Sequence, residues 1–337
     1  MKRYIWTAVL LLLLSGCSGE ESRIPDYAPT PEEKLVIYTS HKEAVYGPII
    51  KEFEERSGLW VQVVTGGTNE LLERIEAEQD APVCDVMFGG GAESLSAYAD
   101  CFEAYAPAAG VQFRDGVWHE TDFWVPFSTL PVVMVYNTRL VREGELCGWQ
   151  DLLSGQWEGK IALADPTISG SGYTAVLTML SSVSDGLWEG MDQLQVQLQG
   201  KVLQDSGDVV REVANGAMAV GLTLEETALK WQAQGAALEV VYPEEGTSAV
   251  PDGGALVAGA PHTDNAKRFL DFIQSRDVQM MVSTQMFRRS VRKDVETPGE
   301  LPELEEITLI PYDVQWAGEI KQEFVEQWSR RYGERLS

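Results

Sequence analysis

One short segment combines glycines and hydroxyl side chains immediately before a helix, and this combination suits the binding of an anion. Residues 169–174 read Ser-Gly-Ser-Gly-Tyr-Thr, follow Asp165-Pro166 and lead into apolar residues at helical spacing. The first N–H groups of a helix have no partner within it, and glycine lets a ligand approach the backbone closely. Phosphate, phosphonate or carboxylate oxygens fit such a place, although a loop with a capping serine is the alternative. The candidates here are Ser169, Gly170, Ser171, Gly172 and Tyr173.

A second set of small and polar residues follows predicted strands in the first third of the chain. Ser40 and His41 follow the first strand; they could bind an anionic group, or the serine could cap the next helix. Gly67 and Thr68 precede a second helix and could form either an anion site or an ordinary turn. A glycine run after the third strand allows close backbone approach but is not a dinucleotide fingerprint. The candidates are Ser40, His41, Gly67, Thr68, Gly90 and Gly91.

Charged candidates come from the second half of the chain. Glu225 and Thr223 follow a predicted strand, and the carboxylate could accept sugar hydroxyls or be a solvated group at a helix start. Arg289 belongs to the basic cluster 288–292, where a guanidinium could hold a phosphate with two hydrogen bonds or balance nearby acids. Asp252 has the same ambiguity. Ser128, in the second alternating block, completes the set.

The sequence argues against an enzyme. Its histidines are His41, His119 and His262; there is no HExxH motif, no GxSxG elbow and no CxxC pair. We therefore expect neither a hydrolase nor a resident cofactor or metal. The net charge of -26 also argues against nucleic acid as a partner, because an acidic surface repels phosphate backbones.

Alternating strands and helices place these candidates. Apolar runs at 35–39, 60–64 and 85–88 alternate with helical spacing at 46–53 and 71–75, which favours parallel strands with helices on the sheet faces. A second block begins near residue 126. Its predicted strands are 132–136, 160–164, 218–222 and 240–242, and its predicted helices are 176–180 and 209–215. A Pro/Gly-rich loop at 243–254 and helices at 266–273, 278–282 and 324–328 complete the pattern.

The N-terminus indicates export and lipid attachment. Basic Lys2 and Arg3 precede the apolar run 5–14, which is too short to span a bilayer. Leu-Ser-Gly-Cys then ends at Cys17 and resembles a lipobox, so residues 1–17 are predicted to be a lipoprotein signal peptide with Cys17 acylated. Residues 18–33 are predicted to form a flexible tether with a reach of roughly 20 Å. The remaining Cys84, Cys101 and Cys147 allow one disulfide or three reduced thiols.

Several motifs together resemble bacterial type II periplasmic solute-binding proteins, in the branch labelled ferric-iron, phosphonate or sugar-phosphate binding. They are LVIYTSHKEAVYGPIIKEFEERSG, VQVVTGGTNELLERIEAE, DVMFGGG, KIALADPTISGSGYTAVLTML, GLTLEETA and NAKRFLDFIQSRDVQ. The resemblance implies an α/β fold of two lobes, each a mostly parallel sheet flanked by helices, joined by two crossover strands and closing on a ligand. Lobe 1 would hold residues 34–125 plus 252–310, lobe 2 residues 126–251, and 311–337 would form a C-terminal helical segment. The resemblance also implies that the protein is a monomer and that its partners are an ABC permease and ATPase.

The resemblance leaves several ligands open. Ferric-binding relatives use two adjacent tyrosines with a histidine and a carboxylate; His41 matches, but Leu222-Thr223-Leu224 stands where the tyrosines would lie. We therefore expect a small anionic solute, either a phosphorylated sugar or another organophosphate or phosphonate. Ferric iron held by His41 and Glu225 is the alternative. A ligand sensor for a membrane kinase would have the same fold.

Overall fold

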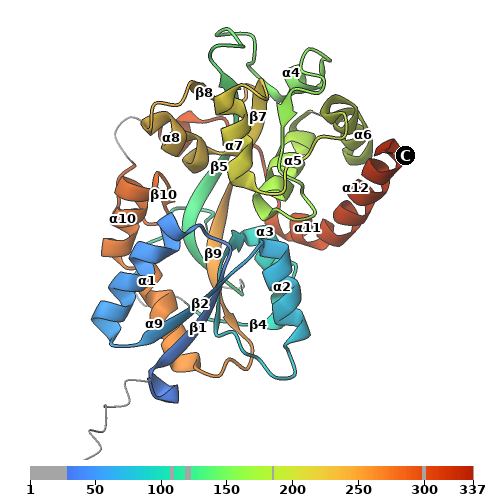
Figure 1. Ribbon diagram of the computed structural model, residues 1–337. Coiled ribbons are helices and arrows are strands. Elements are labelled where there is room, and N and C mark those ends of the chain that lie inside the picture. Colours follow the sequence, from blue (N-terminus) through green and yellow to red (C-terminus); the bar gives the residue numbers. More distant parts are fainter. Residues whose placement is uncertain (1–28, 107–109, 118–122, 184–185, 298–300, 337) are drawn as a thin grey trace, which may run out of the picture.

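The computed structural model describes residues 29–106, 110–117, 123–183, 186–297 and 301–336. The predicted signal peptide, Cys17 and the tether up to residue 28 lie outside this part of the chain. Residues Pro31–Glu33 of the predicted tether form a short 3-10 turn that leads into the first strand. The described chain folds into two lobes that meet along a pair of long strands (Figure 1).

The first lobe contains three parallel strands with helices on both faces, and a crossover strand described below extends this sheet antiparallel to the third of them. Its strand order is β2-β1-β3, and the apolar run of β1 is almost wholly buried. Helix α1 packs one face of buried residues (Val45, Ile49, Ile50, Phe53) into the core and ends at Gly58, whose left-handed φ of 71° suits glycine. The elements are β1 (Lys34–Thr39), α1 (Glu43–Ser57), β2 (Trp60–Thr65), α2 (Thr68–Ala77), β3 (Val86–Gly91), α3 (Ala92–Ser96), η2 (Ala99–Cys101), β4 (Phe102–Glu103), α9 (Thr263–Ile273) and α10 (Arg276–Met286).

The second lobe has its own core and a mixed sheet. Strand β7 pairs parallel with β6, but β7 and β8 both pair antiparallel with the crossover strand β5. This differs from the mostly parallel sheet predicted for this lobe, because one long strand entering from the other lobe supplies its centre. The elements are α4 (Trp149–Leu153), β6 (Ile161–Ala162), α5 (Gly170–Val183), α6 (Leu187–Leu198), α7 (Ser206–Asn215), β7 (Val220–Leu224), α8 (Glu225–Ala233) and β8 (Leu238–Val241).

Two strands cross between the lobes, as the resemblance implies. Strand β5 (Val125–Asn137) is buried along its whole length and pairs antiparallel with β9 (Ala249–Val257). Short β10 (Arg289–Ser290) adds a third strand beside β5 at the junction. Most of β9 falls in the segment predicted as a Pro/Gly-rich loop, and that prediction is wrong. The two-lobed α/β fold itself is confirmed.

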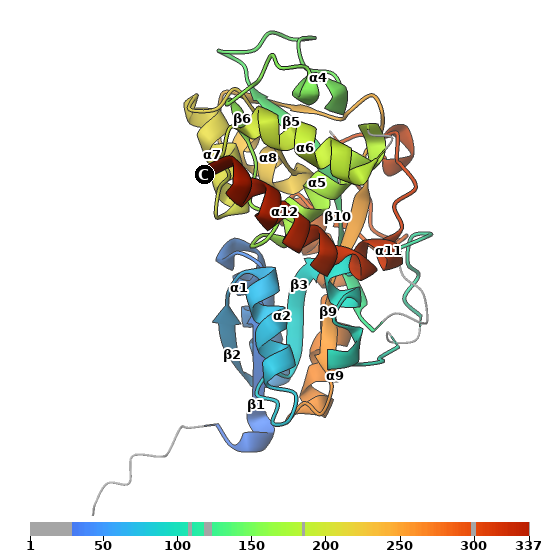
Figure 2. The ribbon, with the colours of Figure 1, turned by 90° about the vertical axis from the view of Figure 1, so that its right-hand side faces the viewer.

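A C-terminal strap runs across the junction of the lobes (Figure 2). It consists of α11 (Val314–Glu319), which packs on α3, and α12 (Lys321–Leu336), which packs on α6. Before the strap, residues beyond the turn η3 (Leu304–Glu306) reach the second lobe, where Leu309 pairs with Thr247. The end of the range predicted for lobe 1 therefore contacts lobe 2.

Candidate functional site

A cleft of about 720 Å³ lies between the lobes and is lined by loops that follow the strands. The first turns of five helices, α1, α2, α5, α7 and α8, border it. At the starts of α1, α2 and α8 the residue before the helix makes no side-chain capping bond, although at α2 the Glu70 carboxylate accepts a hydrogen bond from the Gly67 N–H. The first N–H groups within these helices have no intrahelical partner. Because each helix also presents the positive end of its dipole, the cleft is suited to negative charge.

One wall of the cleft, here called the hydroxyl wall, consists of Thr68, Ser169, Gly170 and Ser171. It joins the start of α2 in the first lobe to the start of α5 in the second. A Cβ on Gly170 would lie 2.9 Å from the Thr68 Oγ1, so only glycine allows the two lobes to approach this closely. The Ser169 hydroxyl lies 3.1 Å from the Ser171 hydroxyl and accepts a hydrogen bond from the Gly172 N–H.

The glycine loop at the end of β3 forms part of the cleft. Gly89 and Gly90 have φ values of 111° and 93°, which favour glycine. A Cβ on Gly89 would lie 2.8 Å from the Ser40 Oγ, and one on Gly90 would lie 2.9 Å from the Thr68 Cγ2. The glycines therefore let the loop pack directly against the polar residues that line the cleft.

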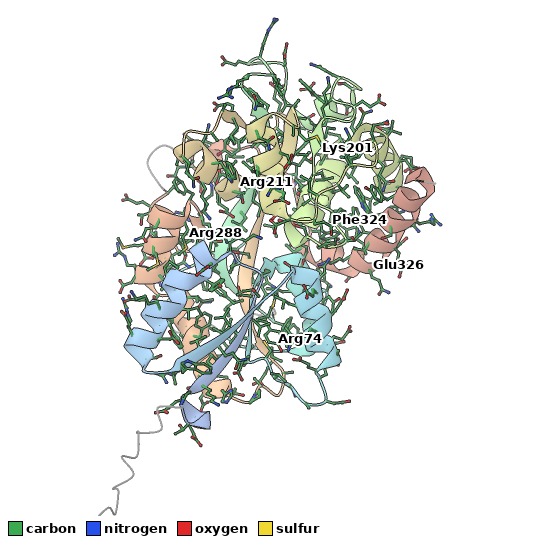
Figure 3. The ribbon with its side chains drawn as sticks, in the orientation of Figure 1. Arg74, Lys201, Arg211, Arg288, Phe324 and Glu326 are labelled. Carbon is green, nitrogen blue, oxygen red and sulfur yellow. The ribbon has the colours of Figure 1, made fainter. Side chains whose placement is uncertain are left out.

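The opposite side, here called the charged floor, consists of His41, Glu226, Lys230, Asp252 and Arg288. Arg288, labelled at the junction of the lobes in Figure 3, donates to the Asp252 carboxylate at 2.6 Å and to the Glu226 carboxylate at 3.4 Å. Lys230 pairs with Glu226 at 2.5 Å. Beneath the cleft, the Ser128 hydroxyl and backbone N–H donate to Asp252. Two cations and two carboxylates thus balance each other.

Two groups of the floor retain unused hydrogen-bonding capacity. The His41 Nε2 and the Arg288 Nε are buried and have no hydrogen-bond partner among the described residues. Burial, followed by the charges of Arg288 and Lys230, holds the pKa of His41 well below its ordinary value, so the imidazole is neutral. Burial opposes the charge of Arg288, but Asp252 and Glu226 outweigh it and raise the pKa of the guanidinium. A ligand would meet a neutral imidazole beside a fixed cation.

Most of the predicted site residues line this cleft, and six do not. Glu225 and Arg289 are buried against each other, with both guanidinium bonds at 2.8 Å, and the Tyr242 hydroxyl donates to the same carboxylate. Tyr173 donates to the Ala317 carbonyl of the strap. The six outside the lining are Ser128, Gly172, Tyr173, Thr223, Glu225 and Arg289, whereas Ser40, His41, Gly67, Thr68, Gly90, Gly91, Ser169, Gly170, Ser171 and Asp252 line it.

The sequence prediction missed Arg288, Glu226 and Lys230. Arg288 and Glu226 are the immediate neighbours of the predicted Arg289 and Glu225, and the predicted pair of iron ligands, His41 and Glu225, is not brought together. Within the described ranges, no three His, Cys, Asp or Glu side chains form a group that could hold a metal ion. Cys84, Cys101 and Cys147 are free thiols.

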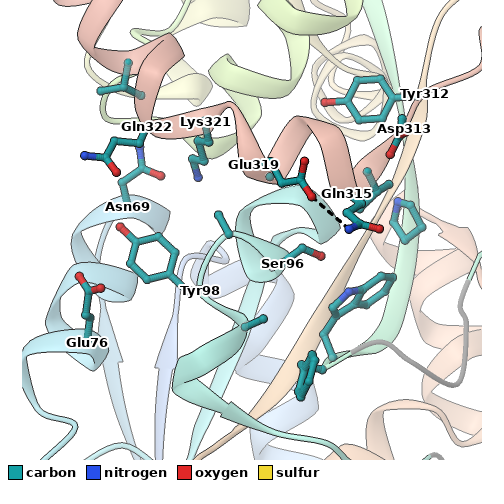
Figure 4. A pocket seen from close by; sticks show the side chains of 18 of the residues that line it. Asn69, Glu76, Ser96, Tyr98, Tyr312, Asp313, Gln315, Glu319, Lys321 and Gln322 are labelled. Atoms are coloured by element: carbon teal, nitrogen blue, oxygen red, sulfur yellow. Dashed lines mark hydrogen bonds between the residues drawn. The ribbon is translucent and has the colours of Figure 1, made fainter.

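Direct bonds already connect the lobes across the cleft. The Asn69 side chain of α2 donates to the Thr167 carbonyl at 2.9 Å, and Lys42 pairs with Asp205 at 2.5 Å. A second cavity of about 1120 Å³ lies on the strap side, between α2 and α3 below and α11 and α12 above (Figure 4). It is separate from the hydroxyl wall and the charged floor.

The sequence profile described as "Bacterial extracellular solute-binding protein" matches residues 35–288, three quarters of the chain, and the protein belongs to this family. It is a solute-binding protein of an ABC importer, and the family consists of transport binding proteins rather than enzymes. A profile for the prokaryotic membrane lipoprotein lipid attachment site matches residues 1–18. The protein is therefore extracytoplasmic and anchored by lipid. In the described ranges, no helix has the length and apolar character needed to span a bilayer.

Three known proteins illustrate the likeness. The periplasmic binding protein AfuA of Actinobacillus pleuropneumoniae, solved with fructose 6-phosphate, is 25% identical with a TM-score of 0.82, covering 89% of this chain and 98% of its own. A protein of Salmonella typhi named as 2-aminoethylphosphonate-binding is 24% identical, covering 74% of each chain. Iron-bound HitA of Pseudomonas aeruginosa is 19% identical with a TM-score of 0.76, covering 88% and 99%, and supports the fold alone.

Proposed function

We propose that the protein captures a small phosphate ester or phosphonate, with a phosphorylated sugar as the leading candidate, and delivers it to an ABC permease and its ATPase. The observation that carries this proposal is the convergence of five helix starts on one cleft, with serine and threonine hydroxyls between them. Backbone N–H groups and hydroxyls at the hydroxyl wall would bind the phosphate oxygens, and the helix dipoles would offset their charge.

The charged floor would bind the rest of the solute. Since Arg288 and Lys230 are matched by Asp252 and Glu226, the floor offers donors and acceptors without a net charge. Sugar hydroxyls, which both donate and accept, suit such a surface better than a second anionic group. The fructose 6-phosphate bound to AfuA and the name of the Salmonella relative support the same class of ligand.

Ferric iron is less compatible with these contacts. A hard trivalent cation requires oxygen ligands that are free to bind it. The oxygens of Asp252 already accept bonds from Ser128 and Arg288, and those of Glu225 accept bonds from Arg289 and Tyr242. Iron binding would require both carboxylates to leave their partners.

A thermal-shift comparison tests the proposed ligand class. Protein that begins after Cys17 would be heated with fructose 6-phosphate, 2-aminoethylphosphonate, ferric citrate and, as matched control, unphosphorylated fructose. A ligand present at about 100 times its Kd adds about 2.7 kcal/mol of stability, a shift of roughly 2–4 °C for this size. We expect a shift with a phosphate ester that Ser171→Ala reduces and that fructose does not produce. A shift with ferric citrate alone would overturn the proposal.

The role in import is tested separately from the ligand. Deletion of the gene should abolish uptake of the labelled phosphate ester by intact cells. Expression of the full-length chain, which includes Cys17, should restore this uptake. Normal uptake in the deletion strain, together with loss of a ligand-induced kinase response, would instead identify a sensor.

A further inference from the structure

Behind the cleft, Glu93 is a fully buried carboxyl group, with no exposed surface, that the proposed function does not use. It is the second residue of α3, directly after the glycine loop. A Cβ on Gly91 would lie 2.6 Å from the Glu93 Oε2, so the carboxyl group lies tightly under the backbone of that loop. Any movement of the carboxyl group would therefore displace the glycine loop, which lines the cleft.

The carboxyl group connects the two lobes. Its Oε1 is hydrogen-bonded to the Thr174 hydroxyl, which belongs to α5 of the second lobe and also lines the cleft. The same hydroxyl lies 3.0 Å from the Gly170 carbonyl. Threonine has a single hydroxyl proton, so it cannot donate to both oxygens at once. With Glu93 ionised, Thr174 donates to it and makes no bond to Gly170; with Glu93 protonated, Glu93 donates to Thr174 and Thr174 donates to Gly170, so both contacts are hydrogen bonds.

Among the described residues, the cation nearest in effect to Glu93 is Lys321, which is hydrogen-bonded elsewhere. The buried Lys321 of α12 donates to the Ser94 hydroxyl at 2.7 Å rather than to Glu93. Its charge lowers the pKa of Glu93, but burial outweighs this effect. Figure 4 shows the Lys321 side chain extending from the strap toward α3. The other titratable groups facing this site are Tyr173 of α5, Tyr312 before the strap and, toward Lys321, Glu73 of α2. The Glu93 Oε2 has no hydrogen-bond partner in the described residues.

We propose that Glu93 is a positioning residue that, in its protonated form, donates to Thr174 and thereby holds the two sides of the solute cleft together. The inference rests on the proposed capture of solute between the lobes. Burial raises the pKa of Glu93, and burial likewise lowers the pKa of Lys321 to about 8, so both groups are poorly solvated where lobes and strap meet.

The proposal gives solute binding a definite pH dependence. When the lobes separate, α5 no longer covers Glu93, and the pKa of the carboxyl group returns toward the ordinary value of about 4.3. Closure then takes up a proton. Binding is strengthened fully below the open-state pKa, and affinity falls by up to tenfold per pH unit as the pH rises toward the raised value.

Calorimetric titration with fructose 6-phosphate between pH 5 and pH 8 tests this linkage. Glu93→Gln keeps a donor for Thr174 but cannot titrate, and Glu103→Gln, a half-exposed acid in the same lobe, is the matched control. The sugar phosphate itself ionises in this range, but this contribution is common to all variants. We expect Glu93→Gln to abolish the protein's share of the slope and Glu103→Gln to retain it. Equal slopes in wild type and Glu93→Gln would overturn the proposal.

Two further measurements keep the inference separate from the identity of the ligand. In ligand-free protein at pH 6, infrared spectroscopy should show a protonated carboxylic acid band that Glu93→Gln removes. Absence of that band overturns the inference, whereas the band without sugar-phosphate binding overturns only the proposed ligand. If Glu93→Gln does not fold, Thr174→Val should lower affinity more at pH 5 than at pH 8, and an equal loss at both values would contradict the proposal.

Discussion

Two buried arginine–glutamate pairs lie side by side at the junction of the lobes, yet they differ in bond geometry and in their relation to the cleft. Arg289 and Glu225 form a closed pair with two bonds of 2.8 Å, completed by Tyr242 and removed from the cleft. Arg288 reaches Glu226 by one longer contact of 3.4 Å and shares its guanidinium with Asp252. The first pair has the geometry of a fixed structural ion pair. The second pair has the geometry of a group that can rearrange when a ligand binds.

The difference arises from strand geometry. Arg288 directly precedes β10 and Arg289 is its first residue; because successive side chains of an extended segment point to opposite sides, Arg288 is directed to the cleft and Arg289 to the interior of the junction. At the start of α8, Glu226 and Glu225 are separated by one helical step and meet the two arginines separately. Two adjacent arginines can therefore have different environments, so that Arg289 is suited to a structural ion pair and Arg288 to contact with a ligand.

Removal of the closed pair is expected to produce the largest effect. Arg289→Met leaves the Glu225 carboxylate buried without its cation, which should cost about 3–5 kcal/mol of unfolding free energy. Urea unfolding followed by circular dichroism measures this. Arg56→Met, which removes an arginine from an exposed surface pair, is the control and should change stability little. Equal stability of Arg289→Met and wild type would show that the pair of Arg289 and Glu225 does not stabilise the fold.

Arg288→Met sharpens the contrast, because it should affect binding more than folding. Lys230 still neutralises Glu226 in this variant, and Asp252 still accepts bonds from the Ser128 hydroxyl and N–H. The loss of stability should therefore be smaller than for Arg289→Met, in which Glu225 retains only the bond from Tyr242. Binding of fructose 6-phosphate, measured by calorimetry, should weaken by at least about 30-fold, since a buried charged donor is lost at the ligand. Unchanged affinity would place Arg288 with Arg289 as a structural residue.

The neighbouring His41 should make stability depend on pH. Its pKa is lowered in the fold, mainly by burial, whereas the unfolded chain binds a proton near pH 6.5. The unfolded state therefore gains protons first as the pH falls, and stability is lost. Between pH 7 and pH 5.5 wild type should lose about 1 kcal/mol more than His41→Gln. A His41 imidazole that titrates near pH 6.5 by NMR would show that water reaches this side chain and would contradict its burial in the charged floor.

The smallest effect is expected for a third pair, which is exposed. Lys42 and Asp205 join the lobes at the rim of the cleft, but water screens both side chains. Lys42→Gln should change affinity less than about fivefold, and added salt should mask the difference. A larger loss would mean that the rim, rather than the floor, governs closure.

The sequence predicted the elements whose pattern is local. The apolar run before Ser40 and the spacing through Phe53 gave β1 and α1, because burial of continuous and periodic apolar residues leaves a direct trace in sequence. Strand β9 was missed because its proline and glycines are typical of a loop. Gly253 is required by packing instead, since a Cβ there would lie 2.4 Å from the Val125 carbonyl oxygen.

The site residues were likewise predictable only where the signal lies within one short segment of sequence. The glycines and serines of the hydroxyl wall were found because their chemistry is local to a helix start. Arg288, Glu226 and Lys230 were not found, because which neighbour faces the cleft depends on the register of β10 against β5 and on the phase of α8. No property of a single segment encodes that choice.

Paired calorimetric titrations of wild-type protein with fructose 6-phosphate and with fructose test the central claim most directly. If helix starts and hydroxyls bind a phosphate group, the ester should bind and fructose should not, and Ser171→Ala should weaken the ester alone. Equal binding of both sugars, or binding of ferric citrate in place of either, would contradict the account.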